Sequence, residues 1–189
     1  MSSEEVLVPG RVAPEDSVSE RLRRAVRDIP DFPKAGILFR DITTLLLDPE
    51  AHRLAVKALA DPFRDDSPDQ IMGIESRGFI FGNALALELG VGFILARKPG
   101  KLPASTMSVS YDLEYGSDSL EVHKDAIQPG SRVLVVDDLI ATGGTAQAAC
   151  ELVELLGGHV AAAVFLIELM DLNGRGRLGD RPVHSILRY

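Results

Sequence analysis

Hydrophobic positions follow two patterns along the chain, one typical of buried strands and one typical of amphipathic helices. The consecutive apolar residues 133–136, three of them β-branched, indicate a buried strand. Shorter or longer apolar runs predict further strands over 71–74, 91–96, 159–169 and 183–189. Helical spacing of apolar residues predicts helices over 18–29, from Pro49 onward, over 78–89 and over 146–156. Because strands alternate with helices, we expect an α/β fold whose mainly parallel sheet is flanked by helices.

Local sequence signals mark the ends of several of these helices. Ser17 and Glu20 have the spacing of a capping box, and the helix that follows is expected to end at Pro30. Asp48 is expected to cap the second helix, with Pro49 at its first position. Gly90 is expected to end the helix over 78–89.

Two segments lack any regular pattern. Residues 1–16 contain Pro9, Gly10 and Pro14, so we expect a poorly ordered N-terminal extension before a single domain over 17–189. Residues 100–121 are polar, with scattered Ser, Thr and Tyr. We expect them to form a long flexible hairpin or hood over a site.

Composition narrows the class of protein. The 189 residues fit one domain, and the net charge of −8 argues against a nucleic-acid-binding protein. No apolar run approaches the roughly 20 residues of a membrane span, and the acidic first residues do not resemble a signal peptide. The one cysteine, Cys150, falls in a predicted helix, so we expect a buried structural thiol. We therefore expect a cytoplasmic protein without nucleic-acid or membrane partners.

The segment after the strand over 133–136 has the chemistry of a phosphosugar site. Asp137 and Asp138 are expected to stop the strand, and their carboxylates would accept hydrogen bonds from two neighbouring ribose hydroxyls. A loop of small residues follows, and Gly143 and Gly144 permit the positive φ angles and the close approach that a phosphate needs. The start of the next helix adds backbone N–H groups and its dipole. No lysine follows the glycines, so this is not a Walker loop.

Two further strand ends carry positive charge. Arg77, within Glu-Ser-Arg-Gly-Phe, opens the helix over 78–89, and its planar guanidinium suits pyrophosphate. Arg97, Lys98 and Lys101 follow the strand over 91–96. A solvated surface position is the simpler interpretation of each of these residues, and both interpretations stay open on this evidence.

Other residues suggest acid–base chemistry and base stacking. Glu114 lies between aromatic residues in the expected hood, so it is either a general acid–base group or an ordinary polar loop residue. Phe39 could stack on a planar base, although core packing is the usual role of a lone phenylalanine. The four histidines are scattered and lack the spacing of metal ligands.

Taken together, these motifs resemble those of a known family. The segment over 137–145 resembles the phosphoribosyl pyrophosphate (PRPP) signature of the type I phosphoribosyltransferases. From about residue 17 to the C-terminus, the chain resembles the adenine phosphoribosyltransferases. The resemblance rests on that signature and on Phe-Pro-Lys-Ala-Gly-Ile-Leu-Phe-Arg-Asp-Ile, Glu-Ser-Arg-Gly-Phe, Arg-Lys-Pro-Gly-Lys-Leu-Pro, Tyr-Asp-Leu-Glu-Tyr-Gly and Glu-Leu-x-x-Leu-x-Gly-Arg.

The resemblance implies a type I phosphoribosyltransferase fold and a purine salvage reaction. Adenine and PRPP would give AMP and pyrophosphate in a homodimer, with Mg²⁺ carried on substrate oxygens and no ligand taken directly from the protein. Glu114 would be the catalytic residue, assisting at adenine N7.

The resemblance also implies a division of the remaining site residues among three groups. The ribose and 5-phosphate of PRPP would contact Asp137, Asp138, Ala141, Thr142, Gly143, Gly144 and Thr145. Pyrophosphate would contact Arg77, Arg97, Lys98, Lys101 and Tyr115, with Arg97 reaching the site of the other subunit. Adenine would contact the ring of Phe39, the wall at Leu169 and the backbone of Leu38 and Arg40.

Two alternatives stay open at this level. Another purine, hypoxanthine or guanine, could be the acceptor, although the enzymes for those bases usually carry a Glu-Asp pair in the signature. A PRPP-sensing regulator could keep the fold without turnover. An added DNA-binding domain and a degraded hood would favour the regulator.

Overall fold

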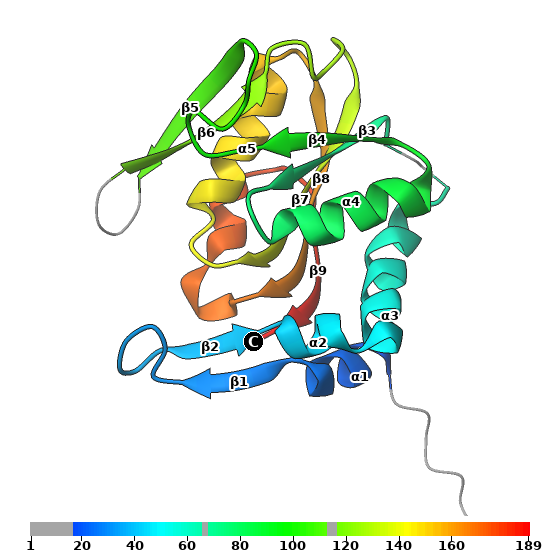
Figure 1. Ribbon diagram of the computed structural model, residues 1–189, viewed down its shortest axis with the longest axis vertical. Coiled ribbons are helices and arrows are strands. Elements are labelled where there is room, and N and C mark those ends of the chain that lie inside the picture. Colours follow the sequence, from blue (N-terminus) through cyan, green and yellow to red (C-terminus); the bar gives the residue numbers. More distant parts are fainter. Residues whose placement is uncertain (1–16, 66–67, 113–116) are drawn as a thin grey trace, which may run out of the picture.

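A parallel sheet forms the centre of the molecule. The computed structural model describes residues 17–65, 68–112 and 117–189. Within these ranges the sheet has the strand order β4-β3-β7-β8-β9, and each neighbouring pair is parallel (Figure 1). The strands are β3 (Gln70–Ile74), β4 (Gly92–Ala96), β7 (Arg132–Ile140), β8 (His159–Glu168) and β9 (Val183–Arg188). The predicted mainly parallel sheet is confirmed.

Helices cover both faces of this sheet. One face packs against α1 (Val18–Ala25), α2 (Thr43–Leu47), α3 (Pro49–Ala60) and α4 (Gly78–Leu89). The other face packs against α5 (Gly144–Leu155) and the antiparallel hairpin β5 (Thr106–Asp112) and β6 (Ser117–His123). Strand β7 shows why both faces are apolar, since Leu134 and Val136 join the first core and Val133 and Val135 the second.

Several predicted helix ends are confirmed. The Asp48 side chain accepts hydrogen bonds from the backbone N–H groups of Glu50 and Ala51, with Pro49 at the first helical position of α3. Helix α4 ends at Gly90, which adopts a left-handed φ of 71°. The capping box of Ser17 and Glu20 is present at α1. These ends depend on residues close together in sequence.

The predicted length of the first helix is wrong. Helix α1 ends at Ala25, and β1 (Arg27–Pro30) instead pairs with β2 (Leu38–Asp41) in an antiparallel hairpin. An ion pair between Arg27 and Asp41 (N···O 2.5 Å) joins the ends of the two strands. Pairing with a distant segment therefore prevails over the helical spacing of Val26 and Ile29.

The predicted end of the central strand is also wrong. Strand β7 continues through Asp137 and Asp138 to Ile140, because β8 continues beside it and pairs Ile140 with Glu168. Helix α5 accordingly begins at Gly144, two residues before the expected start. The acidic pair thus lies within the last residues of a paired strand, which fixes its backbone.

The structure also tests the prediction made for the cysteine. Cys150 is buried in α5 as predicted, and burial raises the pKa of its thiol to about 12.

Short 3₁₀ turns complete the described elements: η1 (Asp61–Phe63), η2 (Met170–Leu172) and η3 (Gly174–Leu178). None of the helices in the described ranges has the length and hydropathy needed to cross a lipid bilayer. The expected extension over 1–16 and the tip of the hood, with Glu114 and Tyr115, lie outside the described residues.

Candidate active site

The site lies where the order of the strands reverses. Strands β3 and β7 are neighbours in the sheet, but the chain continues from β3 to β4 at one edge and from β7 to β8 on the other side. In open parallel sheets, ligands bind beyond the carboxyl ends of the strands at such a switch point. Here the two segments are residues 75–77, between β3 and α4, and residues 141–143, between β7 and α5.

The start of α4 packs directly against the acidic end of β7. A β-carbon on Gly78 would lie 2.6 Å from the carbonyl oxygen of Val136 and 2.9 Å from Oδ1 of Asp137. Only glycine allows this approach, so the glycine of the Glu-Ser-Arg-Gly-Phe motif has a packing reason. The contact fixes the distance between the residue 75–77 segment and the acidic pair.

Arg77 connects the two strand ends. Its Nε lies 2.8 Å from Oδ2 of Asp138. The Asp138 side chain is only 5% exposed, whereas that of Arg77 is 46% exposed and so keeps donors available for a ligand. Asp138, predicted to contact ribose, and Arg77, predicted to contact pyrophosphate, therefore meet at the switch point.

The acidic pair is held at an electrostatic cost. Burial raises the pKa of Asp137 well above its ordinary value, and the neighbouring Asp138 carboxylate raises it further. Burial also raises the pKa of Asp138, although Arg77 opposes that change. Oδ1 of Asp137 accepts a hydrogen bond from the backbone N–H of Asp138 (2.8 Å). Two crowded carboxylates of raised pKa at the mouth of a loop are typical of a binding site.

The loop after β7 has the form expected for an anion site. Gly143 has a φ of 84° immediately before α5, so the backbone turns into the start of the helix. A pocket of about 100 Å³ lies here. It is lined by Asp137, Leu139, Ile140, Ala141, Thr142, Gly143, Gly144, Thr145 and Ala146. The pocket therefore contains all of the predicted ribose and 5-phosphate residues except Asp138.

A second segment supports this loop from outside. A β-carbon on Gly174 would lie 2.2 Å from the carbonyl oxygen of Ala141 and 2.9 Å from the backbone nitrogen of Gly143. The Glu-Leu-x-x-Leu-x-Gly-Arg motif thus contacts the loop through its glycine. Sequence reasoning found this motif but assigned no contact to Gly174, because the contact joins residues some thirty positions apart.

Two of the predicted adenine residues lie beside Arg77 and the end of β7, namely Phe39 and Leu169. The guanidinium carbon of Arg77 is 5.8 Å from the centre of the Phe39 ring, and Phe32 contacts that ring edge-on at 5.1 Å. The backbone N–H of Leu169 donates to the carbonyl oxygen of Ile140 (3.0 Å), which places Leu169 next to the start of the loop. Leu38 is exposed in β2, with 46% of its surface accessible.

Arg40 makes its contacts with other parts of the chain. Its guanidinium carbon lies 3.8 Å from the centre of the Tyr189 ring, and its Nη1 lies 2.5 Å from Oδ1 of Asp28. These contacts fix the strand on which Phe39 lies. They leave the backbone of Arg40 as the part predicted to face a base.

Two of the three positively charged residues after β4, Arg97 and Lys98, are paired with carboxylates of the chain. Nε and Nη2 of Arg97 donate to the Glu75 carboxylate at 3.2 Å each, and Arg97 lowers the pKa of that carboxylate. The Lys98 ammonium contacts the Asp118 carboxylate and the Tyr111 hydroxyl of the hairpin β5–β6. Lys101 is exposed.

Sequence reasoning missed the partner that orders Arg97. Glu75 follows β3 and Arg97 follows β4, and the parallel pairing of Ile74 with Ala96 places them side by side. The sequence showed both residues within motifs but contained no sign of their pairing. The predicted contacts of Arg97, Lys98 and Lys101 with pyrophosphate stay predictions.

Comparisons with known proteins agree with this geometry. Residues 43–181 match the family model described as a phosphoribosyl transferase domain. An adenine phosphoribosyltransferase of Methylococcus capsulatus is 60% identical over 170 residues, which cover 90% of this chain and 99% of that protein. The β1–β2 hairpin lies before the family-model match.

Solved structures give the same result. An adenine phosphoribosyltransferase of Thermoanaerobacter pseudethanolicus has a TM-score of 0.88 and 50% identity, covering 90% of this chain and 99% of that chain. That of Saccharomyces cerevisiae, crystallised with an imino-altritol bisphosphate and adenine, has a TM-score of 0.86 and 44% identity, covering 90% and 98% of the two chains. The predicted type I phosphoribosyltransferase fold is confirmed, and the chain belongs to the adenine phosphoribosyltransferases, the pentosyltransferases of purine salvage that make AMP from adenine and PRPP.

Proposed function

We propose that the switch point holds PRPP and adenine side by side, and that the protein transfers the 5-phosphoribosyl group to adenine with release of pyrophosphate. The observation that carries this proposal is the position of Arg77. It pairs with Asp138 on the ribose side and lies 5.8 Å from the ring of Phe39 on the base side. A ligand spanning these two residues would join a sugar to a planar base.

The ribose and its 5-phosphate are assigned to the end of β7 and the loop that follows. The carboxylates would accept hydrogen bonds from the ribose hydroxyls, and the backbone N–H groups at the start of α5 would donate to the phosphate. The proposed contacts are Asp137, Asp138, Ala141, Thr142, Gly143, Gly144 and Thr145. The bisphosphate bound by the yeast relative is a ligand of the same chemical class.

Adenine is assigned to the space between the β1–β2 hairpin and the start of η2. Phe39 would stack on the base, with Leu169 as the opposing wall. The backbone groups of Leu38 and Arg40 would form hydrogen bonds with the base edge. The yeast relative was crystallised with adenine.

Pyrophosphate is assigned to the cations beside these sites. The proposed contacts are Arg77, Arg97, Lys98, Lys101 and Tyr115. We propose Mg²⁺ as a partner of the substrate, because this ion is usually bound through substrate phosphates and keeps several of its waters. When bound, Mg²⁺ would neutralise charge on the leaving pyrophosphate.

The chemistry needs positioning and charge stabilisation more than a nucleophile from the protein. Departure of pyrophosphate leaves an oxocarbenium-like ribose, which adenine N9 attacks. We assign to Glu114 the role of holding or moving a proton at adenine N7. The hairpin β5–β6 would exclude water that could capture the cation.

Two further proposals concern the assembly and the location. We propose a homodimer, in which Arg97 reaches the site of the other subunit, and a cytoplasmic location. Light scattering on the purified protein measures the mass directly. A monomeric mass under assay conditions would contradict the dimer.

The experiment that tests the function compares three bases. Purified protein is mixed with PRPP and Mg²⁺ and with adenine, hypoxanthine or guanine, and both nucleotide and pyrophosphate are measured. We expect AMP and equimolar pyrophosphate from adenine alone. Turnover of an oxopurine would overturn the base assignment, and PRPP binding without turnover would favour a regulator.

A further inference from the structure

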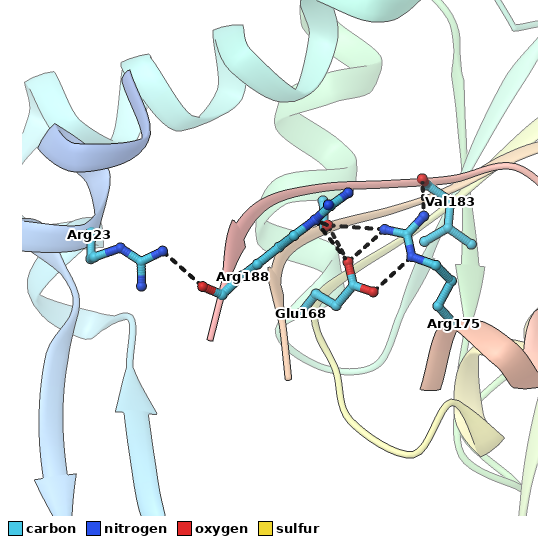
Figure 2. Close-up of polar contacts among 6 residues, drawn as sticks. Arg23, Glu168, Arg175, Val183 and Arg188 are labelled. Atoms are coloured by element: carbon cyan, nitrogen blue, oxygen red, sulfur yellow. Dashed lines mark hydrogen bonds and ion pairs between the residues drawn. The ribbon is translucent and has the colours of Figure 1, made fainter. Parts of the chain in front are cut away.

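An ion pair with a buried carboxylate closes the segment between β8 and η3. Glu168, the last residue of β8, has a side chain that is only 4% exposed. Its carboxylate oxygens accept hydrogen bonds from Nε and Nη2 of Arg175 at 2.8 and 2.6 Å. Figure 2 shows the guanidinium groups of Arg175 and Arg188 both directed at this carboxylate. A two-bond contact of this kind fixes the orientation of both partners.

The same ion pair is anchored to the edge strand β9. Nη1 of Arg175 donates to the carbonyl oxygen of Val183 at 2.8 Å (Figure 2). The Ser185 hydroxyl donates to the Glu168 carboxylate. Arg175 lowers the pKa of Glu168 to about 2, so the carboxylate is ionised across the physiological range. The pair therefore connects β8, η3 and β9 through charge-assisted bonds.

The segment closed by this pair touches the proposed phosphate loop at both of its ends. At the start, the Leu169 N–H donates to the carbonyl oxygen of Ile140. At the other end, Gly174 lies so close to Ala141 and Gly143 that a β-carbon would meet the Ala141 oxygen at 2.2 Å. Glu168 directly precedes Leu169, and Arg175 directly follows Gly174. The ion pair thus holds together the two ends that contact the loop.

We propose that Glu168 and Arg175 are positioning residues that set the base wall at Leu169 and the phosphate loop over 141–143 as one unit. This inference rests on the proposed function of those two parts. If the pair is loosened, both parts move together, so the binding of adenine and of PRPP weakens together. A pair that only stabilised the fold would change stability without changing either KM.

The test replaces Arg175 by lysine, which keeps the charge but cannot form the two-bond contact. The matched control is Arg181→Lys. Arg181 forms the same kind of contact with Glu154 of α5, at 2.7 and 2.8 Å, outside the segment that Glu168 and Arg175 close. For each variant we measure KM for adenine, KM for PRPP, kcat and the midpoint of thermal unfolding, and assay well below that midpoint.

We expect Arg175→Lys to raise both KM values about tenfold with kcat nearly unchanged, since loosening the parts that bind the two substrates removes binding shared by the ground state and the transition state. Arg181→Lys should leave both KM values unchanged. A lower thermal midpoint with unchanged KM values would overturn the proposal, as would a rise for one substrate only.

Two further arms keep the test decisive. If Arg175→Lys does not fold, Ser185→Ala removes the hydroxyl bonded to Glu168 while leaving the charge pair, and a smaller joint rise in KM is expected. The wild-type protein is assayed in the same series. If it does not convert adenine and PRPP, the proposed function fails and this inference fails with it. An active wild type with unmoved KM values in the variants contradicts the positioning role alone.

Discussion

In the loop between β7 and α5, the backbone of Gly143 lies so close to that of Gly174 that there is no room for a side chain. Gly143 has a φ of 84°, and a β-carbon there would lie 2.4 Å from the carbonyl oxygen of Gly174. Gly130, in the turn before β7, has nearly the same φ of 85°, but a β-carbon at that position would have nothing within 4 Å. Both positions therefore require a positive φ, but only Gly143 lies in close contact with another part of the backbone.

This difference gives a controlled prediction at the scale of the residue. Gly143→Ala and Gly130→Ala should each lose about 1–2 kcal/mol of unfolding free energy from the left-handed conformation. Gly143→Ala should lose more, and should also raise KM for PRPP, because the loop must shift away from Gly174. Urea unfolding and steady-state kinetics measure both effects. Equal stability losses with equal KM values would show that the contact with Gly174 is unimportant.

Residue chemistry was predictable where it depends on neighbours in sequence. The acidic pair and Arg77 occur within short motifs, and the structure brings them together at one point. The pairing of Glu75 with Arg97 was not predictable, because it depends on β3 lying beside β4. The roles of Glu114 and Tyr115 stay predictions, since both lie outside the described residues.

At the scale of the element, the β1–β2 hairpin has a special place. It carries Phe39, and it lies before residues 43–181, the range that matches the general phosphoribosyl transferase domain. The segments assigned to ribose and 5-phosphate lie within that range. The stacking contact of the base would therefore come from an element outside that range, whereas the sugar contacts and the opposing wall at Leu169 lie inside it.

This separation predicts a selective effect. Phe39→Ala should weaken adenine binding by about 1–3 kcal/mol, the usual value for stacking of a base on an aromatic ring, with little change in KM for PRPP. The control is Phe63→Ala, which removes another half-buried aromatic ring. That ring contacts His184 and is not among the predicted site residues. The measurement is KM for each substrate in both variants. A joint rise in both KM values in Phe39→Ala would contradict the separation.

Elements were predictable where short-range signals suffice. The ends of α3 and α4 follow from Asp48, Pro49 and Gly90. The stretch over 27–30 was predicted as helix but forms β1, because its pairing with β2 lies beyond any short window. For the same reason the length of β7, which β8 extends to Ile140, was underestimated.

At the scale of the whole molecule, alternating strands and helices predicted a parallel sheet but not its strand order. The order places β3 between β4 and β7, and this brings Arg77 next to Asp138 near the end of β7. Figure 1 shows the hairpins β1–β2 and β5–β6 at opposite ends of the molecule. The strand order depends on how helices pack on both faces of the sheet, so it could not be predicted from any single segment of the sequence.

Acid stability is a property of the whole molecule that two buried carboxylates should govern. The backbone N–H of Thr43, together with Arg27, lowers the pKa of Asp41 from 3.8 to about 2. Arg175 lowers the pKa of Glu168 from 4.5 to about 2. A lowered pKa in the folded state contributes stability above the unfolded pKa, and this contribution is lost as the pH falls toward the folded pKa.

We therefore expect the unfolding free energy to fall as the pH is lowered from about 4.5 to about 2. Asp41→Asn should be less stable than the wild type at pH 6, and the difference should shrink at pH 3. Urea unfolding at the two pH values measures it, with Glu88→Gln at an exposed ion pair as the control. A difference that stays constant with pH would exclude Asp41 as a source of the acid sensitivity.

The acidic pair at the end of β7 has a consequence for the lifetime of the protein. Burial raises the pKa of Asp137 and Asp138, so ionising both carboxylates side by side in the ligand-free protein costs stability. A bound sugar that donates hydroxyls, accompanied by a cation, offsets that cost, and any ligand of the folded state opposes unfolding by mass action. Cells rich in PRPP would then degrade this protein more slowly than cells depleted of it, so that the supply of the substrate would help to set the amount of the enzyme.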